Sequence, residues 1–171
     1  MPTFPAKSWR VLMLVLLSIS CIGCDQATKQ IAATHLTGDA AISYLGDTLR
    51  LCYAENPGAF LGLGGKLSAS SRFWFLIIVN AVLLTGVAWA LLVPARVHRL
   101  NCIALGLILT GGIGNLIDRV GNDGLVTDFL NLGLGPIRTG IFNVADVAIS
   151  TGAVLLTLSL FRGERKPAAA E

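Results

Sequence analysis

Charged side chains are scarce in this chain: they make up 13% of its 171 residues, against roughly 25% in a typical soluble domain. Hydrophobic residues account for 54%. The composition therefore excludes an ordinary water-soluble domain and favours a single integral membrane domain over residues 1–171. The formal net charge of +3 is small and evenly spread, which argues against a nucleic-acid-binding surface.

Histidine and cysteine are also few, with two and four residues respectively. In the topology predicted below, His35 and His98 lie on opposite sides of the membrane, and so do Cys52 and Cys102. We therefore expect no metal site and no disulfide between Cys52 and Cys102.

The sequence CIGC, which contains Cys21 and Cys24, has three interpretations. It follows a basic N-terminal segment and an apolar run, so it could end a lipoprotein signal with Cys24 as the lipidated residue. It could instead be a redox pair, but the surrounding sequence has no thioredoxin-like βαβ pattern. Three more apolar stretches follow, and Asp25 and Lys29, one helical turn apart, are typical of the polar end of a retained helix. We therefore interpret both cysteines as small apolar helix residues.

Four apolar stretches can each span a membrane, which takes about 20 mostly apolar residues for about 30 Å of hydrocarbon. The first is the shortest and reaches that length only when its polar end, through Gln30, is included. The linker PARVHR is short enough to make the second and third antiparallel. The predicted spans cover residues 9–30, 73–93, 100–117 and 141–161.

The distribution of lysine and arginine predicts the orientation, because basic residues near spans are retained in the cytoplasm. One side of the predicted bundle carries seven basic residues against Glu164 and Glu171, namely Lys7, Arg10, Arg96, Arg99, Arg162, Arg165 and Lys166. The other side carries six basic residues against eight acids, namely Asp25, Asp39, Asp47, Glu55, Asp118, Asp123, Asp128 and Asp146. We therefore expect both termini in the cytoplasm and the segments 31–72 and 118–140 outside it.

The two outer segments have the patterns of strands. In DTLRLCYAEN, Leu49, Leu51 and Tyr53 alternate with other residues at the period of a half-buried strand. GAFLGLGG and GLVTDFLNLGLGPIRTGIFN contain further short apolar runs broken by Gly and Pro. The fold class expected is thus an all-α membrane bundle of four helices with a small extracytoplasmic β-cradle. The glycines of the first outer segment also favour a mobile flap over Ala54 to Lys66.

Ionisable residues at the edge of a span usually mark function or a partner in the bundle. Asp146 lies near the outer end of the last span, with Asn143 on the same face; the alternative is a helix-capping role for Asp146. Asn115 and Arg119 share a face of the third span and could both belong to the site. The alternative to a functional role is that Arg119 extends to the lipid head groups with Asp118 as its local ion-pair partner. The glycines of GGIG are expected to permit close helix contact.

Asp128 is a lone acid in the apolar run GLVTDF of the second outer segment. If this run folds back over the bundle, it brings Asp128 beside Asp146. Two adjacent carboxyl groups cannot both ionise cheaply, so one retains a proton, and the pair can activate water and protonate a leaving amine. That is the chemistry of an aspartic peptidase.

The chain contains five motifs in this order: DQATK, ENPGAF, GGIGNLIDR, GLVTDF and FNVAD. The lipoprotein signal peptidases (signal peptidase II) have the corresponding motifs in the same order, and the chain resembles this family over nearly its whole length. The resemblance implies that Asp128 and Asp146 are the catalytic pair. It implies that Asn56, Asn115, Arg119 and Asn143 line the site, and that Asp25 and Lys29 serve its architecture or substrate handling. The sequence departs from the family pattern at NPGAF, which is one alanine shorter.

The resemblance also implies the substrate and the location. The expected protein is a monomeric, multi-pass enzyme of the bacterial inner membrane with four transmembrane helices and its active site at the extracytoplasmic face. Its expected partners are membrane lipid and prolipoproteins that carry a diacylglyceryl cysteine, cleaved just before that cysteine, with no metal or organic cofactor and no nucleic acid.

A small proton-coupled transporter or channel component is the alternative function, with Asp146, Arg119 and Asp25 as a proton relay. A transporter would place such residues near the middle of the bilayer. In this sequence they cluster at one face of the predicted bundle, which favours the peptidase.

Overall fold

The computed structural model describes residues 7–38, 41–58, 68–94 and 97–163. Its helices are α1 (Lys7–Leu17), the π-helical turn η1 (Ser18–Ile22), α2 (Gly23–His35), α3 (Ala69–Leu92), α4 (Arg99–Gly121) and α5 (Val144–Gly163). Four helical stretches are long and apolar enough to cross a membrane: Lys7–His35, Phe73–Leu92, Arg99–Gly121 and Val144–Phe161. The described residues thus confirm the four predicted membrane-spanning helices.

All four helices differ by a few residues from the predicted spans, and two of the differences bear on the site. The helix α5 begins at Val144 rather than Ile141, because Phe142 still pairs with Leu130 in an isolated β-bridge. The helix α4 continues past residue 117 to Gly121, so that Asp118 and its neighbours project from a helix.

The first spanning helix is continuous through its π-helical turn, which lies just before Asp25. Single π-turns inside α-helices are frequent near functional sites. Beyond the turn, Asp25, Lys29 and Ala32 recur at helical spacing and are buried, so the polar end of this helix faces the protein interior. Cys21 and Cys24 are free thiols within the same helix, as their interpretation as helix residues requires.

Four antiparallel strands form a sheet in the order β1 (Ile42–Tyr44), β2 (Leu49–Asn56), β3 (Val126–Leu134) and β4 (Ile137–Arg138). The predicted strand in DTLRLCYAEN is confirmed as β2, and the second outer segment forms the β3–β4 hairpin. The register pairs Ala54 with Asp128. Apart from Gly58, the run GAFLGLGG lies outside the described residues, and so do the other predicted flap glycines.

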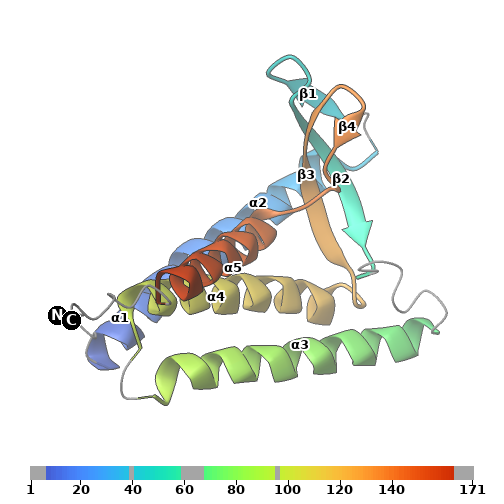
Figure 1. Ribbon diagram of the computed structural model, residues 1–171. Helices are drawn as coiled ribbons and strands as arrows, with labels where there is room; N and C mark the ends of the chain where they lie inside the picture. Colours follow the sequence, from blue (N-terminus) through green and yellow to red (C-terminus); the bar gives the residue numbers. More distant parts are fainter. Residues whose placement is uncertain (1–6, 39–40, 59–67, 95–96, 164–171) are drawn as a thin grey trace.

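Glycines allow α5 to lie against α4. A β-carbon on Gly111 would lie 2.6 Å from the carbonyl oxygen of Ala145, and one on Gly152 would lie 2.5 Å from that of Ala104. Such distances leave room only for hydrogen, so the expectation that the GGIG segment permits close helix contact is confirmed. The first residues of α1 and the last residues of α5 lie at one end of the bundle, and the sheet lies at the other (Figure 1).

Arg10 joins the first helix to the end of α3. Its side chain is 3% exposed, and its Nη1 donates to the carbonyl oxygens of Leu91 at 3.0 Å and Pro94 at 2.8 Å. Carbonyl groups at a helix C-terminus lack partners within the helix and attract a cation. Arg10 therefore stabilises the end of α3 and fixes it to α1.

Replacing Arg10 with methionine should lower the free energy of unfolding by about 1.5–3 kcal/mol, because buried carbonyl groups lose a charged donor. The measurement is chemical or thermal unfolding of the purified protein in detergent. Lys7→Met is the matched control, since Lys7 lies on the same helix and is exposed. Equal losses in the two variants would contradict this role for Arg10.

Candidate active site

Asn143 and Asp146 form a reciprocal cap at the start of α5. The Oδ1 atom of Asn143 accepts from the backbone N–H of Asp146 at 2.9 Å, and Oδ2 of Asp146 accepts from the backbone N–H of Asn143 at 3.2 Å. This is a capping box. The capping role considered for Asp146 therefore exists, but it uses only one carboxylate oxygen. The other oxygen, Oδ1, accepts from Nδ2 of Asn115 at 2.8 Å.

The side chain of Asn143 links the two aspartates. It is fully buried, and its Nδ2 donates to Oδ1 of Asp128 at 2.6 Å, while its backbone N–H reaches Asp146. The same Nδ2 also lies 3.1 Å from Oδ1 of Asn115 and 3.3 Å from the carbonyl oxygen of Thr127. The strand β3 thus folds back over the bundle, and Asp128 and Asp146 share one amide-lined site.

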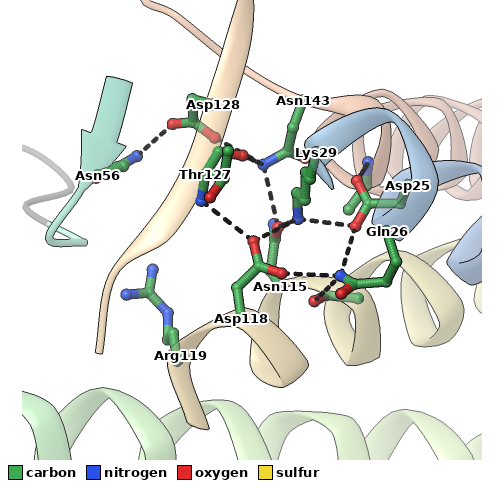
Figure 2. Close-up of polar contacts among 12 residues, drawn as sticks. Asp25, Gln26, Lys29, Asn56, Asn115, Asp118, Arg119, Thr127, Asp128 and Asn143 are labelled. Atoms are coloured by element: carbon green, nitrogen blue, oxygen red, sulfur yellow. Dashed lines mark hydrogen bonds and ion pairs between the residues drawn. The ribbon is translucent and has the colours of Figure 1, made fainter. Parts of the chain in front are cut away.

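Asp128 is 2% exposed, and its second oxygen, Oδ2, accepts from Nδ2 of Asn56 at 2.9 Å (Figure 2). Burial raises the pKa of Asp128 above its usual range, and the negative charge of Asp146 raises it further. The hydrogen bonds from Asn56 and Asn143 lower the pKa but do not cancel the rise. Asp128 therefore stays protonated to a higher pH than an ordinary aspartate does.

Behind the aspartates lies a buried charged cluster centred on Lys29 (Figure 2). Its Nζ lies 2.7 Å from Oδ2 of Asp25 and 2.9 Å from Oδ2 of Asp118, and it donates to Oδ1 of Asn115 at 3.0 Å. Oδ1 of Asp25 accepts from the backbone N–H of Ala145 at 2.8 Å. The first helix is therefore tied to α4 and to the start of α5.

Asp118 connects the same cluster to the sheet. Its Oδ2 accepts from the backbone N–H of Thr127 at 3.1 Å, and its Oδ1 accepts from Nε2 of Gln26 at 2.8 Å. Asp118 was considered as a local partner of Arg119, but its ion pair is with Lys29. Asp118 and Arg119 are successive residues of a helix, so their side chains point about 100° apart and contact different partners.

Arg119 is buried rather than at the head groups. Its Nη1 donates to the carbonyl oxygen of Gly124 at 2.8 Å, and its Nε has no hydrogen-bond partner among the described residues. Figure 2 shows it apart from the hydrogen-bonded cluster. Its guanidinium packs on Gly58, where an added β-carbon would lie 2.7 Å from Nη1. Arg119 thus connects the turn after α4 to the loop that follows Asn56.

An apolar groove of about 480 Å³ leads to Asp146. It lies between α5 and the end of the sheet, and its other lining residues are Leu132, Thr139, Gly140, Ile141, Phe142, Val147, Ser150 and Thr151. A larger polar cleft of about 610 Å³ is lined by Lys29 and Asp118 but by neither Asp128 nor Asp146. Of these two hollows, the smaller groove is the one that reaches a member of the Asp128–Asp146 pair.

The structure brings together all eight residues predicted from the sequence, as two layers. The first layer consists of Asn56, Asn115, Asn143, Asp128 and Asp146. The second layer, behind it, consists of Asp25 and Lys29, and Arg119 lies at the side. The sequence interpretation missed Gln26 and Thr127. Gln26 lies three residues before Lys29, a helical spacing that could have identified it. Thr127 contributes backbone groups, which carry no sequence signal.

Comparisons with known proteins agree with this geometry. The sequence profile of the family described as Signal peptidase (SPase) II matches residues 17–162. The lipoprotein signal peptidase of Desulforapulum autotrophicum is 36% identical over 85% of this chain and 89% of its own length. That of Symbiobacterium thermophilum is 34% identical over 91% and 98%. A solved structure described as a bacterial membrane enzyme has a TM-score of 0.78 at 25% identity and covers 100% of this chain and 98% of its own. The resemblance is confirmed.

Gly58→Ala should lower the free energy of unfolding more than the same substitution at another glycine that has a positive φ. At φ +77° a β-carbon is strained, and at Gly58 it would also overlap Arg119 and the Cδ1 of Leu76 at 2.6 Å. The control is Gly46→Ala, at φ +60° with nothing within 4 Å of the added carbon. Unfolding in detergent should show a loss of about 1 kcal/mol for Gly46→Ala and a clearly larger one for Gly58→Ala. Equal losses would mean that the packing against Arg119 has no energetic effect.

Infrared titration can test the protonation of Asp128. The protonated carboxyl band that Asp128→Asn removes should persist above pH 3.8, the usual value, because burial and the nearby charge of Asp146 raise this pKa. Asp47 provides a contrast, since its hydrogen bonds from Arg50 and Ser43 hold its pKa below the usual range. The Asp47→Asn difference band should therefore vanish at a lower pH. The same midpoint for both groups would contradict the assignment.

Proposed function

Because this chain belongs to the signal peptidase II family of membrane aspartic peptidases, which cleave signal peptides from bacterial prolipoproteins, we propose that Asp128 and Asp146 are its catalytic pair. The observation that carries the proposal is the position of Asn143, which contacts both carboxyl groups from one buried side chain and its own backbone. No other pair of acids among the described residues is joined in this way next to an apolar groove.

The two aspartates have different environments, which favours different roles. Both aspartates accept N–H donors through both carboxyl oxygens, but Asp146 is half-buried and lines the groove, whereas Asp128 is 2% exposed. Asp146 is therefore the general base that takes a proton from water as it attacks the scissile carbonyl. Asp128, whose pKa is raised, is the acid that protonates the departing amine. The pair supplies both proton transfers, so this mechanism requires no cofactor.

The substrate in this proposal is a prolipoprotein with a diacylglyceryl group on the cysteine that follows the scissile bond. The groove beside Asp146 runs along α5, which is a membrane-spanning helix, and its lining is largely apolar. A signal helix in the bilayer can thus lie along α5 and place its outer end at the aspartates. The lipid on the cysteine then stays in the membrane while the bond is cleaved.

The proposed site faces the extracytoplasmic side of the inner membrane, and both chain termini face the cytoplasm. The sheet and the aspartates lie at the end of the bundle opposite to the start of α1 and the end of α5 (Figure 1). Lys7, Arg10 and Arg99 lie toward that other end, as retention of basic residues in the cytoplasm requires. The site is complete within one chain, which favours a monomeric domain over residues 1–171. The transporter alternative is not supported by the relatives found.

Asp128→Asn and Asp146→Asn should each lower cleavage at least about a hundredfold, because one proton-transfer group is lost in each. The measurement is release of the signal peptide from a diacylglyceryl-modified prolipoprotein by purified protein in detergent, followed by mass spectrometry. Asp123→Asn is the control, since Asp123 is exposed and does not line the groove. Normal cleavage by either active-site variant would refute the catalytic pair.

A further inference from the structure

The buried ammonium group of Lys29 lies one residue away from the proposed general base. Lys29 donates from Nζ to Oδ1 of Asn115 at 3.0 Å, and Asn115 donates from Nδ2 to Oδ1 of Asp146 at 2.8 Å. Lys29 is 4% exposed, and among the described residues it forms no hydrogen bond or ion pair with Asp128 or Asp146. Its positive charge lowers the pKa of Asp128 from a distance, whereas its hydrogen-bonded connection to Asp146 runs through Asn115.

The two ends of the Asn115 amide are chemically different, and Lys29 distinguishes them. An ammonium group can only donate, so it favours the orientation with the carbonyl oxygen toward Lys29 and the NH₂ group toward Asp146. In the flipped orientation, two donors would face each other and the carbonyl oxygen would face a carboxylate. Nδ2 of Asn143 has two hydrogens; it donates to Oδ1 of Asp128 at 2.6 Å and to Oδ1 of Asn115 at 3.1 Å, and the second contact supports the same orientation of Asn115.

We propose that Lys29 is a positioning residue of the catalytic pair, which orients the Asn115 amide so that it donates to Asp146 and keeps this carboxylate the proton acceptor. The inference rests on the proposed roles of Asp128 and Asp146. It gives the charge of Lys29 a function in the reaction beyond the joining of helices.

The ionisable groups around this arrangement come from several elements. Lys29 faces Asp25 on its own helix and Asp118 on α4. The carboxyl groups of Asp128 and Asp146 interact electrostatically with each other and with the positive charge of Arg119 on α4. Removal of the ammonium group would leave the carboxylates of Asp25 and Asp118 without their buried countercharge. A test must therefore separate the loss of stability from the loss of amide orientation.

The main test compares Lys29→Met with Gln30→Met, two replacements by methionine at adjacent positions of α2. Gln30 is exposed and does not line the groove beside Asp146. For each folded variant, kcat and KM are measured against pH with the lipidated precursor. Lys29→Met should lower kcat about 10- to 100-fold at neutral pH, leave KM within about twofold and move the acidic limb of the kcat profile to higher pH. Gln30→Met should keep the kcat profile of the wild type.

A double variant addresses the case in which Lys29→Met does not fold. Asp25→Asn removes one uncompensated charge, and its Oδ1 can still accept from the backbone N–H of Ala145. Lys29→Met/Asp25→Asn should therefore regain stability but retain the low kcat and the shifted acidic limb. The proposal is overturned if either folded variant shows the kcat profile of the wild type.

The same assay distinguishes this failure from failure of the proposed function. If Asp146→Asn abolishes cleavage while Lys29→Met has a normal profile, the catalytic pair stands and Lys29 has only a structural role. If Asp146→Asn cleaves normally, the proposed function itself is wrong.

Discussion

The ion pairs of Lys29 with Asp25 and Asp118 are the contacts on which the rest of the site depends. Asp25 accepts the backbone N–H of Ala145, at the start of α5, through its other oxygen, Oδ1. Asp118 accepts the backbone N–H of Thr127, in β3, through the same Oδ2 that pairs with Lys29. One buried cluster thereby joins two spanning helices, the beginning of a third and a strand. Burial of charge is costly unless every group is paired, so the cluster strongly disfavours other arrangements of these elements.

At the start of α5, helix capping also positions a carboxylate that is proposed to be catalytic. The capping box of Asn143 and Asp146 places a carboxylate at the third residue of the helix with its direction set by the backbone. The free oxygen of that carboxylate is then available to Asn115 and to the groove. Asp128 instead comes from a strand, where pairing with β2 fixes its depth. Rigid elements thus hold both carboxyl groups, as proton transfer over short distances requires.

The two carboxyl groups have different environments, which suits the opposite roles proposed for them. Asp128 is almost fully buried, and the resulting loss of hydration raises its pKa. Asp146 is only half-buried and opens to an apolar groove along α5. The proposed acid within the protein and the proposed base beside the groove suit a peptide bond that approaches from the membrane.

The sequence alone was enough to predict the four spanning helices, the strand β2 and the eight residues of the site. The spans follow from long apolar runs, which need no tertiary information, and the site residues follow from ionisable groups at helix ends and from motif order. Only the tertiary structure decided that Asp118 pairs with Lys29, that Thr127 contributes backbone groups, and that Asn143 joins the aspartates. These contacts connect residues far apart in the chain through directional hydrogen bonds and backbone atoms, and neither spacing nor composition encodes that geometry.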